Sequence, residues 1–171
     1  IQNYTKAIGL ALQSIEIGNE ISEPQLQNNS YADAGLAYFL SGDLNSAKKL
    51  IEQAQKYDVP ENNHNASALH GIIALRQGDE VTARGAFVRA IGQADEILSK
   101  TAEYYEALDA KGLSICGLAI CDASTRSAQV LRLKKDDLRF SIDDLRLQAV
   151  ETFKKARQIA PHAGVVKRVL R

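Results

Sequence analysis

Histidine, cysteine and acidic side chains are the groups with which this chain could carry out chemistry. His64 and His70 lie six residues apart, which places them on different faces of a helix and argues against a shared metal ion. We expect His64 in a polar loop and His70 at a core-facing position. Cys116 and Cys121 lie five residues apart, a spacing that matches neither a CxxC motif nor a zinc ligand pair. We expect both to be reduced thiols in the core.

Catalytic groups are scarce in the rest of the chain. The third histidine, His162, follows the last proline, and the adjacent acids Asp136-Asp137 and Asp143-Asp144 read as solvated helix surface or helix caps. No nucleophile, base and orienting group stand at a known motif spacing, and the sequence contains no GxxxxGK[ST] phosphate-binding loop. We therefore expect a protein that is not an enzyme and that uses neither a metal nor a cofactor.

The composition is that of a globular protein. Hydrophobic residues make up 45% and charged residues 25% of the 171 residues, and no apolar run approaches the roughly 18 residues that span a bilayer. The N-terminus lacks the basic and then apolar layout of a signal peptide, so we expect a cytoplasmic protein without a membrane segment. Because the chain contains no methionine and ends in what reads as an unfinished helix, we expect it to be a piece of a longer polypeptide.

The elements that would position any functional group follow from an internal repeat. The stretch GLAYFLSGD, residues 35–43, returns 36 residues later as GIIALRQGD, residues 71–79. Apolar residues recur at three and four spacing around each copy, which indicates short helices, and each Gly-Asp pair marks a turn into a second, amphipathic helix. Asn29 and Ser30 are available as N-caps of the first helix. The expected helices cover residues 31–40, 44–58, 66–77 and 80–98.

A third unit is longer than the first two. An apolar helix is expected over residues 104–120, and its partner over residues 147–161, which leaves an amphipathic insertion near residues 122–143. Residues 1–25 read either as the second helix of a preceding unit or as a helix that caps the array. Residues 162–171 are expected to form a C-terminal capping helix. The sequence therefore predicts one all-α domain with units at 29–60, 65–98 and 104–161.

These units resemble tetratricopeptide repeats. The resemblance rests on small, bulky and aromatic residues that agree in register across the units, over about 130 residues. The matching residues are Tyr31, Ala34, Gly35, Tyr38, Gly42, Ala47, Ile51 and Ala54 in the first unit; His70, Gly71, Ala74, Gly78, Ala83, Phe87 and Ala90 in the second; and Leu113, Cys116, Gly117, Ile120, Ala149, Phe153, Ala156 and Pro161 in the third. We expect Gly35, Gly71 and Gly117 to let neighbouring helices approach closely.

The resemblance implies a right-handed solenoid of antiparallel helix hairpins with a concave inner wall. More narrowly, the succession of ALHGIIALRQGD, YYEALDAKGLSICGLAIC and a basic helix ending APHAGVVKRVLR resembles the C-terminal repeat region of large bacterial signal-transducing ATPases with numerous domains. In those proteins the repeats serve as sensor or scaffold. The implied function is a protein-protein interaction module of a larger signalling protein. The ATPase itself would lie outside this chain.

The implied binding site is the groove formed by the first helix of each hairpin. Its expected residues are Asn29, Ala32, Leu36 and Phe39 from the first unit; Asn65, Ala68, Ile72, Leu75 and Arg76 from the second; and Lys111, Ser114, Leu118 and Cys121 from the third. Family members that bind chaperones hold a C-terminal carboxylate with Lys, Asn and Arg side chains at such positions. Small and aliphatic residues stand at those positions in this chain, so we expect an amphipathic helix or peptide in a mostly apolar groove instead.

Two alternatives stay open. An exposed apolar groove is costly, so the amphipathic insertion around residues 130–142 could fill it from within the same chain. The second alternative follows from charge, since residues 1–125 hold 9 basic and 16 acidic side chains whereas residues 126–171 hold 12 and 5. That basic segment could bind nucleic acid or an acidic partner, although few aromatic residues accompany it. Its basic side chains include Arg132, Lys134, Lys135, Arg139, Lys154, Lys155, Arg157, Lys167 and Arg168.

Overall fold

The computed structural model describes residues 4–129 and 142–161, of which nearly all are helical. The helices in these ranges are α1 (Tyr4–Ile21), α2 (Pro24–Ser41), α3 (Leu44–Ala54), α4 (Pro60–Arg76), α5 (Glu80–Lys100), α6 (Tyr105–Gln129) and α7 (Ile142–Ile159). The described residues contain no β-strand, so the prediction of an all-α fold is confirmed. None of these helices is long and apolar enough to cross a lipid bilayer.

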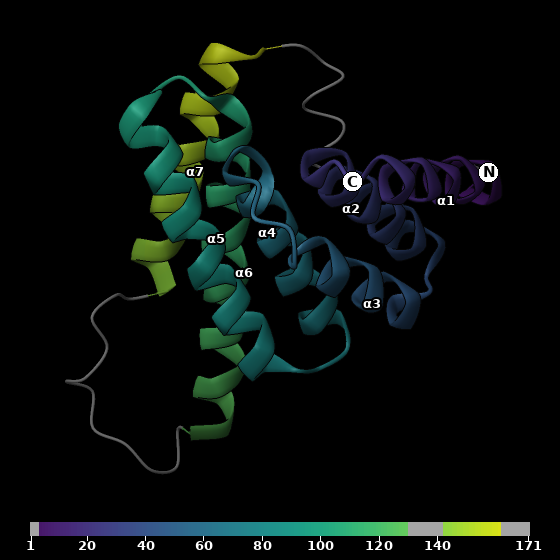
Figure 1. Ribbon diagram of the computed structural model, residues 1–171. Helices are drawn as coiled ribbons and strands as arrows, with labels where there is room; N and C mark the ends of the chain where they lie inside the picture. Colours follow the sequence, from purple (N-terminus) through teal and green to yellow (C-terminus); the bar gives the residue numbers. More distant parts are fainter. Residues whose placement is uncertain (1–3, 130–141, 162–171) are drawn as a thin grey trace.

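Most helices pack on the helix that follows them in the chain. Extensive contacts join α1 to α2, α2 to α3, α4 to α5, α5 to α6 and α6 to α7. Contacts also skip one helix, because α4 touches both α2 and α6. Figure 1 shows α5, α6 and α7 side by side at one end, α1, α2 and α3 at the other, and α4 between them.

The two Gly-Asp pairs form the turns that the sequence predicts. Gly42 and Gly78 have φ angles of 94° and 78°, a left-handed conformation that glycine adopts at the end of a helix without steric penalty. The following aspartates cap the next helix, since Asp43 accepts a hydrogen bond from the Ser46 amide and Asp79 from the Thr82 amide, both at 3.0 Å. Hydrogen bonds from the amide and side chain of Ser46 lower the pKa of Asp43, and those from the side chain and amide of Thr82 lower the pKa of Asp79.

The core is built where a large side chain meets a glycine on a neighbouring helix. A Cβ atom added to Gly35 would lie 2.8 Å from Ile51, and one added to Gly71 would lie 2.5 Å from the Phe87 ring. Gly117 approaches the same ring even more closely from α6. Ile51 and Phe87 are both fully buried. The expectation that these three glycines permit close helix crossings is confirmed.

Helices α2 and α4 begin earlier than predicted. The sequence predicts a helix from residue 31 with Asn29 or Ser30 as its N-cap, but α2 begins at Pro24 and is capped by the Glu23 carboxylate. Likewise α4 begins at Pro60, six residues before the predicted start. Both starts follow the preference of proline for the first helical position, and the polar segments after the prolines are helical rather than loops.

A buried asparagine explains why the polar start of α2 is stable as a helix. Asn28 is fully buried, and its amide nitrogen donates to the carbonyl oxygens of Ala54 at 2.9 Å and Tyr57 at 3.2 Å. Its own carbonyl oxygen accepts a hydrogen bond of 2.6 Å from Asn62 on α4. Asn28 thereby satisfies the end of α3 and ties α2 to the start of α4.

The predicted boundaries of the third unit also change. Helix α6 continues to Gln129, so residues 122–129, assigned to the insertion by the sequence, belong to the helix. Its partner α7 begins at Ile142, five residues before the predicted start. The rest of the insertion, residues 130–141, and the predicted capping helix, residues 162–171, lie outside the described residues.

The Phe87 contacts generate a stability prediction. Replacing Gly117 with alanine would place a methyl group inside the Phe87 ring, which cannot retreat because it is fully buried. We expect a loss of about 1–3 kcal/mol in the free energy of unfolding, even though alanine favours helix. Urea unfolding followed by far-UV circular dichroism measures it.

Gly92 provides the matched control, because nothing lies within 4 Å of a Cβ atom added there. Gly92→Ala should stabilise the protein by roughly 0.5–1 kcal/mol through helix propensity alone. Equal effects of the two substitutions would contradict the close packing of α5 against α6.

Candidate functional site

The predicted groove runs over α2, α4 and α6. The described contacts between α2 and α4 and between α4 and α6 place these three helices next to one another. Arg76 joins the first two, because its guanidinium carbon lies 5.7 Å from the centroid of the Phe39 ring. Such a cation-π contact contributes about 0.5–1 kcal/mol at an exposed site. The structure therefore brings together two of the predicted groove residues from different units.

An apolar strip continues from α4 to α6. Ile72, Leu75 and Leu118 are partly buried and pack against the same core cluster, which contains Phe87. Because these side chains reach into the core, the exposed apolar area is smaller than the sequence suggests. Of the predicted groove residues, only Leu36 ranks among the exposed large hydrophobic side chains described, with 38% of its surface exposed.

Asparagine side chains line one polar edge of this surface. The side-chain nitrogen Nδ2 of Asn62 donates to Oδ1 of Asn29 on α2 at 3.0 Å. The Nδ2 atom of Asn65 donates to Oδ1 of Asn62 at 3.1 Å. Asn29 and Asn65, both predicted for the groove, are thus linked through a residue that the sequence analysis did not select. Asn62 had no local signal, because its role depends on the neighbouring helix.

Three groove assignments are wrong because the structure buries their side chains. Ser114 is fully buried and donates a hydrogen bond of 2.7 Å to the Ala110 carbonyl oxygen in its own helix. Ala68 is 3% exposed and packs against Ala90 and Ala110. Cys121 is 1% exposed and belongs to the Phe87 cluster, which agrees with its alternative assignment as a core thiol. Burial also raises its pKa.

Lys111 is the fourth residue that the structure places elsewhere. Its ammonium group forms an ion pair with Asp95 on α5, so the side chain is directed to α5 rather than to the predicted row on α2 and α4. Ala32 is partly buried against the cluster that contains Ile51. The predicted groove is therefore reduced mainly to residues from α2 and α4, with Leu118 from α6.

A misplaced register explains the errors on α6. The sequence analysis aligned Gly117 with Gly35 and Gly71, but Gly112 is the glycine that faces Phe153 of α7, with an added Cβ atom 3.0 Å from its ring. That contact is equivalent to those of Gly35 with Ile51 and of Gly71 with Phe87. A shift of five residues turns a helix by about 140°, so the predicted α6 positions, Leu118 included, are not equivalent to those on α2 and α4. Leu118 stays with the strip only because it packs against the same cluster as Ile72 and Leu75.

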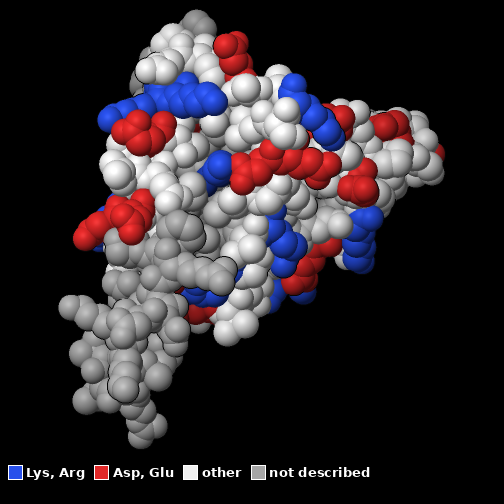
Figure 2. All heavy atoms as spheres, turned by 90° about the vertical axis from the view of Figure 1, so that its left-hand side faces the viewer, with Lys and Arg blue, Asp and Glu red and all other residues white. Residues whose placement is uncertain are grey.

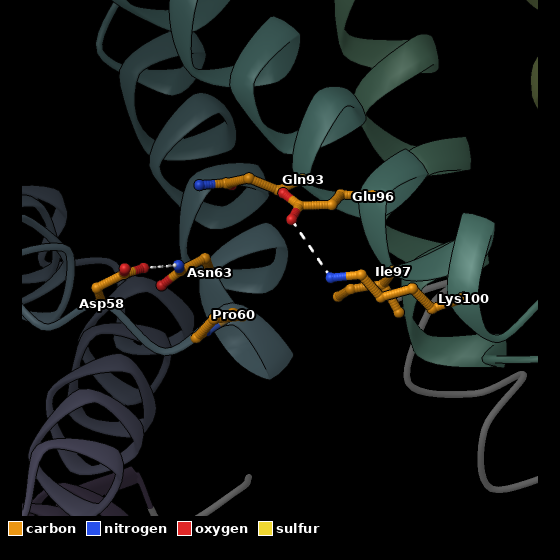
Figure 3. A pocket seen from close by; sticks show the side chains of 7 residues that line it. All are labelled: Asp58, Pro60, Asn63, Gln93, Glu96, Ile97 and Lys100. Carbon is orange, nitrogen blue, oxygen red and sulfur yellow. Dashed lines mark hydrogen bonds and ion pairs between the residues drawn. The ribbon is translucent and has the colours of Figure 1, made fainter.

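A separate polar hollow of about 260 Å³ lies between the start of α4 and the end of α5. It is lined by Asp58, Pro60, Asn63, Gln93, Glu96, Ile97 and Lys100. Figure 3 shows two paired sets of polar groups, with Asn63 donating to Asp58 at 2.7 Å and Lys100 lying 3.5 Å from Glu96. The buried Oε1 atom of Gln93 has no hydrogen-bond partner among the described residues. No cysteine or histidine lines this hollow. The described residues also contain no group of three or more His, Cys, Asp or Glu side chains placed to hold a metal ion.

The charges on the face shown in Figure 2 are mixed. Basic and acidic side chains are interspersed there instead of forming a surface of one sign. On α7, the basic Arg157 pairs with Asp109 of α6, and Lys154 lies 3.0 Å from Glu151. These described cations of the basic segment are therefore partly neutralised by neighbouring acids.

No protein-family model matches the chain, and no curated protein is detectably similar to it in sequence. A function for this chain is therefore inferred from the arrangement of its side chains.

The histidines differ from the prediction in one respect. His70 is buried as expected, and its Nδ1 atom lies 3.0 Å from the side-chain oxygen Oε1 of Gln55. His64, expected in a loop, is fully buried within α4 and contacts the Tyr104 ring edge-on. Burial lowers the pKa of His64 to about 4, against a smaller opposing effect of Glu106. Neutral His64 is therefore the form that the fold accommodates.

This burial predicts acid sensitivity. In the unfolded chain His64 takes up a proton near pH 6.5, but in the folded chain only near pH 4. The contribution of neutral His64 to the free energy of unfolding is fully present above pH 6.5 and is lost as the pH falls towards 4. Urea unfolding should show a loss of about 2 kcal/mol between pH 7.5 and pH 5, and His64→Leu should remove most of this dependence. The His70 pKa is also lowered by burial, so His70→Leu is the control that separates the two. An unchanged pH dependence in His64→Leu would contradict the assignment.

Proposed function

We propose that this chain is a non-enzymatic helical-repeat module, similar to tetratricopeptide repeats, that binds another protein segment. Two features support the repeat architecture: the 36-residue sequence repeat and the recurrence of a glycine against a large side chain in the pairs α2–α3, α4–α5 and α6–α7. On this proposal the helix pairs form a right-handed solenoid. The chain would serve as a scaffold or sensor within a larger cytoplasmic signalling protein.

One observation carries the binding proposal. Phe39 of α2 lies beside Arg76 of α4, and Ile72 and Leu75 of α4 pack against the same buried cluster as Leu118 of α6. This surface is apolar along its middle and has asparagine amides at one edge. It matches an amphipathic helix or peptide, whose apolar side would meet the strip while its polar groups meet the amides.

This surface has few basic side chains, which disfavours ligands that carry a free carboxylate or a phosphate group. Arg76 is its exposed cation, and that side chain already contacts Phe39. A free carboxylate or a phosphate group would need several converging donors with positive charge. We therefore propose that apolar burial, with a few amide hydrogen bonds, provides most of the affinity.

The groove proposal is tested with helical peptides. A phage-displayed library of amphipathic helices is selected against the chain, and the dissociation constant of a selected peptide is measured by fluorescence anisotropy. Leu36→Glu and Ile72→Glu should each raise that constant at least roughly tenfold, which corresponds to about 1.4 kcal/mol, because each places a charge in the apolar strip.

Val81→Glu is the matched control, since Val81 is 85% exposed and lies on α5 rather than on a groove helix. Far-UV circular dichroism and urea unfolding verify that the half-buried Ile72 site tolerates the change. Peptides that bind the two groove variants as tightly as the control would contradict the proposal.

The second candidate function is a module whose groove is filled by its own insertion and whose basic C-terminal segment binds nucleic acid or an acidic partner. The observation that favours it is the concentration of 12 basic residues after residue 125. Binding of a labelled single-stranded oligonucleotide at two salt concentrations tests it, because phosphate contacts give an affinity that falls as salt rises. Under this candidate, Lys155→Glu should weaken binding at low salt. If the oligonucleotide shows no affinity that falls with rising salt, the nucleic-acid candidate is eliminated.

A further inference from the structure

Helix α1 uses the same inward positions as the later second helices of the repeat. Ala11, Ile15 and Gly18 have the spacing of Ala47, Ile51 and Ala54, 36 residues later, and of Ala83, Phe87 and Ala90, a further 36 residues later. Ile15 and Gly18 are buried. The Oγ atom of Ser14 lies 2.6 Å from that of Ser30, which confirms that this side of α1 faces α2.

At two outward positions α1 carries apolar residues where the other helices in this register carry polar ones. Leu10, Ile17 and Ile21 are 58%, 53% and 60% exposed, and their spacing of seven and four residues places them on one face. The positions equivalent to Leu10 hold Ser46, Thr82 and Gln148, and those equivalent to Ile17 hold Gln53, Arg89 and Lys155. Packing within the repeat therefore does not require apolar residues there.

A row of polar side chains runs beside this apolar face. Lys6, Gln13 and Glu20 are spaced by seven residues and follow one edge of it, and all three are exposed. The row has a positive end and a negative end. A partner helix that runs in the opposite direction with the same row would place each positive end beside a negative end.

We propose that the outward face of α1 is a self-association surface on which α1 of a second copy packs antiparallel about a two-fold axis. With the axis between Gln13 and Ser14, Leu10 of each copy meets Ile17 of the other. Lys6 of each copy then lies beside Glu20 of the other, which gives two ion pairs by symmetry.

The size of the face sets the strength of this dimer. Helix α1 has 18 residues and is therefore about 27 Å long. One helix face of this length is smaller than the roughly 800 Å² per partner of a standard stable interface. The dimer is therefore weak and forms in a concentration-dependent way.

Sedimentation equilibrium of the 171-residue chain over a range of concentrations tests the proposal. The apparent mass should rise from 18.7 kDa towards twice that value with concentration and stay at the monomer value in Ile17→Glu. The matched control is Gln53→Glu, which introduces the same charge at the equivalent position of α3 and should leave the dimer intact. A monomer at every concentration, or a dimer that Ile17→Glu does not weaken, would overturn the proposal.

Charge exchange tests the antiparallel direction. Lys6→Glu should raise the dissociation constant of the dimer, and the double variant Lys6→Glu/Glu20→Lys should restore it, because the exchange recreates both ion pairs. Failure of the double variant to dimerise would overturn the antiparallel arrangement. Leu36→Glu, in the groove, should leave the dimer unchanged. Dissociation by Leu36→Glu would assign the interface to the groove and overturn the α1 proposal.

Discussion

The Phe87 ring lies between two glycines that belong to different helices, and the positions of three helices depend on it. Gly71 of α4 and Gly117 of α6 approach the ring so closely that neither position has room for a Cβ atom. A single fully buried side chain on α5 therefore determines how near α4 and α6 come to α5. The Gly35 contact with Ile51 and the Gly112 contact with Phe153 are of the same kind, so a glycine packed against a large residue joins α2 to α3, α4 to α5 and α6 to α7.

The proposed binding surface is a consequence of this core. Ile72, Leu75 and Leu118 pack against the cluster that contains Phe87, so their position at the surface follows from the spacing of α4 and α6. A buried polar side chain also fixes the relative positions of the helices. Asn28 connects α2 with the end of α3 and the start of α4 through hydrogen bonds, which leaves little freedom in how the first pair of helices meets the second. Under the proposed function, we expect this surface to change shape little on binding.

Local chemistry accounts for the features that could be predicted from the sequence. The Gly-Asp turns depend on one left-handed glycine and one capping aspartate, and both effects act within a few residues. The starts of α2 and α4 were missed because the segments after Pro24 and Pro60 are rich in asparagine, which is a weak helix former. Asn28 and Asn62 are stable in helices because partners on other helices satisfy their amide groups, and those partners are remote in the sequence.

The all-α class, the 36-residue period and the pairing of small with large residues follow from the order of residues along the chain, because each depends on local helical periodicity and turn chemistry. The sequence alone could not decide which glycine of α6 faces which aromatic ring. Gly112 and Gly117 lie in the same helix and both suit a close crossing, but Gly112 meets Phe153 and Gly117 meets Phe87. Helical periodicity indicates which side of a helix is buried, whereas the partner on that side depends on how the helices assemble. The partner of each glycine on α6 is therefore known only from the folded arrangement of the helices, which also determines which side chains of α6 reach the proposed binding surface.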